Sequence, residues 1–170
     1  MALTPNDREQ HGEITKLLSL TDNVDEQYLH RATDEIYVYQ PFLLSMFLGY
    51  KLDTTDAELD EILKIWLLIW EFFKEKRNIR TVKLTEQCFE QAQSKNVAFL
   101  RYLHGKGSDE VMKERVSNNL KELGSKSLFA TILAKFHTKP ALVRMDMEKK
   151  GIILVGIKSL VEALEGITLR

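Results

Sequence analysis

The sequence predicts an all-α protein, folded as a compact bundle of seven or eight helices around one central apolar helix. Glycine and proline are scarce, with eight and three copies in 170 residues, whereas a strand-rich chain needs frequent tight turns. Apolar residues recur three and four positions apart through most of the chain, which is the period of a helix. Residues 81–84 and 151–155 resemble strands, but neither has a partner strand nearby, and a single strand is not stable.

The first two helices follow from their N-terminal signals. Thr4 as N-cap and Pro5 as the first helical residue predict a helix that ends near residue 20. Asn23, with Glu26 three residues later, resembles a capping box and predicts that a second helix runs to about residue 39. The apolar positions of this second helix keep the helical spacing: Leu29, Ala32, Ile36 and Tyr39.

The two most apolar segments come next. Pro41 interrupts the second helix, so a new helix is expected over residues 41–50, apolar on nearly every face. Thr55 and Glu58 form a capping box that begins the central helix, residues 56–77, whose acidic first turn and basic last turn suit the helix dipole. The central helix is expected to bury Leu59, Ile62, Leu63, Trp66, Ile69, Trp70 and Phe73.

The second half of the chain supplies the remaining helices, and the whole chain is predicted to be one domain, residues 1–170. Glycines at 105, 124 and 166 and a proline at 140 predict where these helices end. No repeat divides the chain into smaller units, and residues 78–83 are the longest expected loop. The expected helices cover about residues 85–105, 108–123, 125–136 and 146–164.

Composition also limits the cellular location and the partners that can be predicted for the protein. The single cysteine, Cys88, cannot form an internal disulfide. The N-terminal residues lack the pattern of a secretory signal, and the longest apolar run, residues 65–70, is too short to span a bilayer. We therefore predict a cytoplasmic protein without a membrane partner.

Charge is unevenly distributed, although the net charge is only −1. Residues 1–73 hold fourteen acidic and five basic side chains, net −9, whereas residues 74–170 hold eleven and nineteen, net +8. Such asymmetry can indicate a polyanion partner for the basic half. Because the basic residues are interspersed with acids, we expect instead that the two halves attract each other, within a monomer or across a dimer.

The junction before Pro41 is a candidate ligand pocket. Tyr37, Tyr39 and Gln40 crowd this break, and irregular junctions between helices can bind small molecules. The alternative is structural, because tyrosine rings can cover a core while their hydroxyl groups reach water.

Two further groups of residues are candidate sites of other kinds. Glu26, His30 and Asp34 project from one helix face and could bind a metal together with a further histidine, or form local charge pairs on a solvated face. A basic cluster could bind nucleic acid, although a pI near 6.4 disfavours a dedicated DNA-binding protein. This cluster comprises Lys74, Lys76, Arg77, Arg80 and Lys83.

Protein partnership is the function class that the sequence favours. No nucleotide-binding motif or paired metal-ligand spacing is present, so no cofactor is predicted, and whether the protein is an enzyme is left open. A small bundle has room for one fully central helix, yet residues 41–50 and 59–73 are both apolar nearly all round. Either the other helices surround both segments, or one segment meets a partner protein or a second copy in a homodimer. An interaction or regulatory module is therefore the leading hypothesis, ahead of a small-molecule-binding or metal-binding enzyme and of a nucleic-acid-binding protein.

Overall fold

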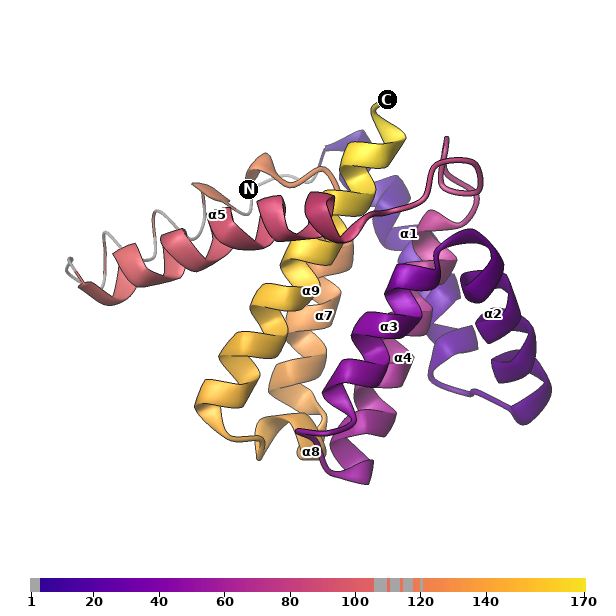
Figure 1. Cartoon of the computed structure of the whole chain (residues 1–170), viewed down its shortest axis with the longest axis horizontal. Helices are drawn as coiled ribbons and strands as arrows, with labels where there is room; N and C mark the ends of the chain where they lie inside the picture. Colours follow the sequence, from indigo (N-terminus) through magenta and orange to yellow (C-terminus); the bar gives the residue numbers. More distant parts are fainter. Residues whose placement is uncertain (1–3, 106–109, 111–113, 115–117, 120) are drawn as a thin grey trace.

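The chain is all-α in the computed structural model, which describes residues 4–105, 110, 114, 118–119 and 121–170. Over these residues it forms eight helices and no strand, which confirms the predicted fold class (Figure 1). The predicted helix over residues 108–123 lies largely outside the described residues. The described helices are α1 (Pro5–Thr21), α2 (Glu26–Tyr39), α3 (Pro41–Tyr50), α4 (Asp56–Phe73), α5 (Glu86–Gly105), α7 (Lys126–Thr138), α8 (Pro140–Val143) and α9 (Met147–Thr168).

Helix α4 is the centre of the bundle. It packs against α1, α3, α7 and α8, and eleven of its eighteen residues are buried, so it is enclosed as its apolar composition requires. Most of its predicted core face is fully buried, whereas Leu59 and Leu63 are only half-buried because they lie toward its outer side. The buried members are Ile62, Trp66, Ile69, Trp70 and Phe73.

The end of α4 differs from the prediction. The helix stops at Phe73 rather than at residue 77, and the chain then turns through residues 74–83. Within this connection Asn78 has a φ of 65°, a left-handed conformation that no helix can continue through. Ile79 and Leu84 are almost fully buried, so this connection is packed against the core rather than solvated throughout.

The helix caps confirm two predictions and correct one. The Thr4 and Thr55 side chains each accept a hydrogen bond from the third backbone N–H of their helices, at 3.2 and 3.3 Å. At α2 the cap is Asp25 and not Asn23, because the Asp25 carboxylate accepts from the Tyr28 N–H at 2.7 Å. Asn23 instead donates its side-chain amide to Ser19 at the end of α1.

Helix α9 forms the second buried column. It packs along α5, which crosses it and extends beyond the other helices (Figure 1). A buried contact joins the two where the Asn96 side-chain amide donates to the Ser159 hydroxyl at 3.0 Å. The predicted stop at Gly166 is wrong, because α9 continues to Thr168 and buries Ile167 in the core.

A close contact between α3 and α9 depends on a glycine. A methyl group built on Gly156 would lie 2.3 Å from the hydroxyl oxygen of Tyr50, well inside van der Waals contact. Tyr50 lies edge-on to Trp66, and burial raises the pKa of its hydroxyl to about 12. Glycine at this position therefore lets the end of α3 lie against α9.

Gly156→Ala should destabilise the protein by about 1–3 kcal/mol, as expected for overpacking, measured by urea unfolding. Tyr50→Phe removes the atom that the new methyl group would meet. Gly156→Ala should therefore cost clearly less in a Tyr50→Phe background, which a double-mutant cycle measures. An equal cost in both backgrounds would contradict this contact.

Candidate functional site

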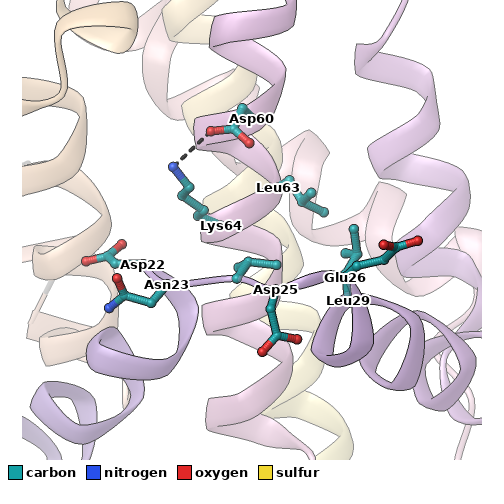
Figure 2. A pocket seen from close by; sticks show the side chains of 9 residues that line it. Asp22, Asn23, Asp25, Glu26, Leu29, Asp60, Leu63 and Lys64 are labelled. Carbon is teal, nitrogen blue, oxygen red and sulfur yellow. Dashed lines mark ion pairs between the residues drawn. The ribbon is translucent and has the colours of Figure 1, made fainter.

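A groove of about 350 Å³ lies beside α2 and α4 (Figure 2). Its wall comes from three places: the link between α1 and α2, the first turn of α2, and the first half of α4. The residues that line it are Asp22, Asn23, Val24, Asp25, Glu26, Leu29, Asp60, Leu63 and Lys64.

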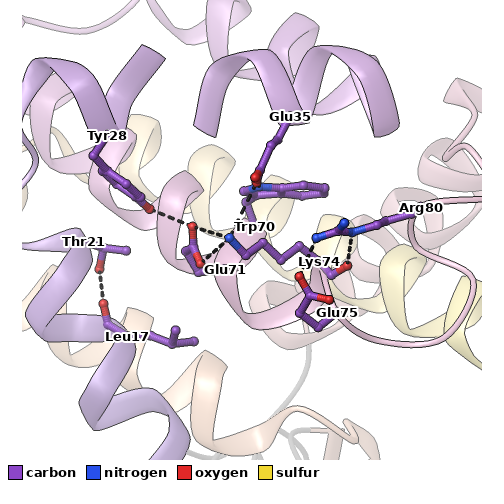
Figure 3. Close-up of polar contacts among 9 residues, drawn as sticks. All are labelled: Leu17, Thr21, Tyr28, Glu35, Trp70, Glu71, Lys74, Glu75 and Arg80. Atoms are coloured by element: carbon purple, nitrogen blue, oxygen red, sulfur yellow. Dashed lines mark hydrogen bonds and ion pairs between the residues drawn. The ribbon is translucent and has the colours of Figure 1, made fainter. Parts of the chain in front are cut away.

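The local sequence places the link between α1 and α2 at the edge of the groove. Thr21 is fully buried at the last position of α1, and its hydroxyl donates to the Leu17 carbonyl at 3.1 Å (Figure 3). At the other end of the link, Asp25 caps α2. Because both ends of the link are fixed, the carboxylates of Asp22 and Asp25 are held beside the groove.

The floor of the groove is apolar. Val24, Leu29 and Leu63 are partly buried and pack against a small core cluster formed by Tyr28, Ala32 and Leu67. This cluster joins α2 to α4. A bound group would therefore contact hydrocarbon below and carboxylates at the rim.

The rim carries a surplus of negative charge. Among the lining residues, four carboxylates face one ammonium group, that of Lys64. Lys64 lies 2.8 Å from Asp60, and Lys135 of α7 lies 2.5 Å from Asp22. In the described part of the chain, Asp25 and Glu26 have no lysine or arginine within ion-pair distance. These two carboxylates are the charges most available to a binding partner.

A partly buried polar network holds α2 against the second half of α4 (Figure 3). The Tyr28 hydroxyl donates to the Glu71 carboxylate at 3.1 Å, and Lys74 lies 2.9 Å from the same carboxylate. Burial and the adjacent Glu71 charge raise the pKa of Tyr28, so it stays a neutral donor. Glu35 of α2 accepts from the indole N–H of Trp70 at 3.0 Å. The groove wall is therefore rigidly attached to the core.

The three residues of the predicted junction pocket have separate surroundings. Tyr37 is 69% exposed on α2. Tyr39 stacks on Trp70, with the Arg80 guanidinium 5.2 Å above its ring. Gln40 is fully buried, and its amide bonds to the backbone of the connection after α4. The three side chains therefore differ in exposure and in the groups that they contact. That they bind a ligand together stays a prediction.

Glu26, His30 and Asp34 lie on the exposed side of α2. The His30 Nε2 is 3.8 Å from a Glu26 oxygen, and both side chains are more than three-quarters exposed. Among the residues that the structure describes, no three histidine, cysteine or acidic side chains are grouped so that they could bind a metal ion.

Most of the predicted basic cluster is paired with carboxylates. Lys74 contacts Glu71 and Glu35, Lys76 lies 3.8 Å from Glu13, and Arg80 pairs with Glu75. Two members of the cluster are exposed without such a pair within the described residues: Arg77 and Lys83. This surface presents less positive charge than its sequence suggests.

The sequence did not indicate the groove. Its acidic residues come from segments more than thirty positions apart, and the acids of α4 had been explained by the helix dipole. One signal was available, namely the net charge of −9 over residues 1–73, which this groove partly explains.

The fold and the groove together define a small all-α bundle with an acidic surface cleft. Comparison with protein-family models, curated proteins and solved structures gives no match to this chain. Within the described residues, none of the helices is both long enough and apolar enough to span a lipid bilayer.

Proposed function

We propose that this chain is a protein-interaction module that self-associates through the outer face of α3. The observation that carries the proposal is that α3 is almost wholly apolar, yet only one of its faces packs against the core. Leu43 is buried, whereas Ser45, Leu48 and Gly49 are exposed on the outer face. Of the two apolar segments, α4 is enclosed by other helices, whereas α3 is enclosed on one side only.

The outer face of α3 is apolar and uncharged. Residues 41–50 contain no acidic or basic side chain. Leu48 is 60% exposed, and Leu52, just beyond the helix, is 90% exposed. Ser45 and Gly49 also lie on the exposed side, and a methyl group added at Gly49 would meet nothing within 4 Å. Small residues beside leucines let a second helix approach closely.

A second copy of this chain is the partner that this face fits. In a two-fold dimer the same patch meets itself, so a charged patch would be repelled, whereas the uncharged face of α3 is not. A stable dimer buries about 800 Å² on each partner, which is more than one short helix offers. The last turn of α2 directly precedes α3 and carries two further exposed apolar side chains, Tyr37 and Val38, so we include it in the proposed surface.

Sedimentation equilibrium over a wide protein concentration range tests this proposal. The unmodified protein should show a monomer–dimer equilibrium, whereas Leu48→Glu/Leu52→Glu should remain monomeric because two buried, unpaired carboxylates would oppose association. Leu169→Glu is the matched control, since Leu169 is 85% exposed at the far end of α9, and it should dimerise normally.

A monomer at every concentration would overturn the proposal. So would a dimer that persists unchanged in Leu48→Glu/Leu52→Glu. Circular dichroism of each variant checks that its helices are intact, because the substituted side chains are exposed and their replacement should leave the fold in place.

A further inference from the structure

We infer that the acidic groove beside α2 and α4 binds a basic segment of a partner protein, with a lysine or arginine side chain lying on its apolar floor. This inference rests on the proposed role as an interaction module and names a second surface and the chemistry of its partner. It concerns the carboxylates of Asp25 and Glu26, which the self-association face of α3 does not use.

The shape and lining of the groove suit a long basic side chain. Lysine and arginine combine a hydrocarbon stem with a charged end, and they commonly lay the stem on apolar surface while the charge reaches polar groups. Here the floor is Val24, Leu29 and Leu63, and carboxylates lie at the rim. A cavity of about 350 Å³ is at the small end of ligand sites, so it fits one or two side chains of a segment.

Charge complementarity selects a basic partner. The four lining carboxylates outnumber the one lining ammonium group, and Lys64 is already shared between Asp60 and Glu61 at 2.8 and 3.2 Å. An acidic partner would be repelled at this rim.

A metal ion fits the groove less well than a basic side chain. Asp22 and Asp60 are each paired with a lysine, and Asp25 uses an oxygen to cap α2. A hard cation needs several oxygen ligands at close range, whereas an ammonium or guanidinium group can bridge two carboxylates of a looser rim.

Fluorescence anisotropy with a labelled twelve-residue peptide of alternating leucine and arginine tests the inference. Asp25→Asn/Glu26→Gln removes two charges while keeping a good N-cap, because asparagine caps helices as well as aspartate does. It should weaken peptide binding about tenfold, as the loss of two partly exposed ion pairs predicts. The matched control is Asp146→Asn/Glu148→Gln, which removes the same two charge types from the N-cap and the first turn of α9 and should bind normally.

Any of these results would overturn the inference: no binding of the peptide at low salt, equal binding by Asp25→Asn/Glu26→Gln, or equal binding of a peptide with glutamine in place of arginine. Spermine that competes as strongly as the peptide would also overturn it, because the groove would then bind a free polycation. The titration is repeated with Leu48→Glu/Leu52→Glu, which should bind the peptide normally. The experiment therefore distinguishes a groove that does not bind the peptide from a chain that does not self-associate.

Discussion

Replacing Trp66 with alanine should lower the free energy of unfolding by about 3–5 kcal/mol, the range for large aromatic truncations in a core. Trp66 is 1% exposed at the centre of α4. Its indole N–H donates to the Leu43 carbonyl at 2.9 Å, and its ring contacts those of Phe47 and Tyr50. Truncation would leave a cavity and would also remove this buried hydrogen bond, so lost packing and the lost bond both lower stability.

Urea unfolding followed by far-UV circular dichroism measures this loss. Leu169→Ala is the control, because Leu169 is 85% exposed just beyond α9 and lies outside both proposed interaction surfaces, and its truncation should change stability by no more than about 0.5 kcal/mol. A loss below about 1 kcal/mol for Trp66→Ala would mean that the site relaxes around the missing ring and that Trp66 does not support the core.

Local signals predicted most of the helix starts. Thr4, Thr55 and Pro41 begin helices where the sequence placed them, because caps and proline act within one turn of the chain. The helix ends were predicted less well. Gly166 is a normal stop signal, yet α9 continues past it because burial of Ile167 outweighs the weak preference of one glycine.

The residues of the groove could not be predicted in the same way. Asp22, Asp25 and Asp60 come together only because α2 packs on α4, and no spacing along the chain contains that information. The sequence supplied the surplus of acid in residues 1–73 but not its location. The two apolar segments were recognised from composition alone, whereas tertiary packing decides which of them is enclosed.

Gln40 shows how a junction residue can resemble a ligand group and be structural. Its side-chain amide nitrogen donates to the carbonyls of Ile79 and Val82 at 2.6 and 2.7 Å, and its oxygen accepts from the Leu84 N–H at 2.7 Å. The side chain is fully buried. It therefore supplies hydrogen-bond partners to three backbone groups between α4 and α5, beside the turn hydrogen bonds that this connection makes within itself.

Gln40→Glu should cost at least about 4 kcal/mol at neutral pH, among the largest effects of any single substitution in this protein. The new carboxylate oxygen would lie where an N–H now faces two carbonyl oxygens, so two donor contacts become repulsive and a charge is buried without a partner. Gln40→Met keeps the length without the charge and should cost less, about 2–3 kcal/mol, from the unpaired backbone groups alone.

The pH dependence separates charge from lost hydrogen bonds. Burial beside two carbonyls raises the folded-state pKa of the introduced carboxyl above its unfolded value near 4.3. The folded state therefore binds the proton more tightly, so stability relative to the unmodified protein is highest below the unfolded pKa and is lost as the pH rises through the folded pKa. Urea unfolding at a series of pH values should show Gln40→Glu recovering toward Gln40→Met as the pH falls, while Gln40→Met stays parallel to the unmodified protein. A constant difference between the two variants would mean that water reaches position 40 and that the amide is not enclosed by the connection after α4.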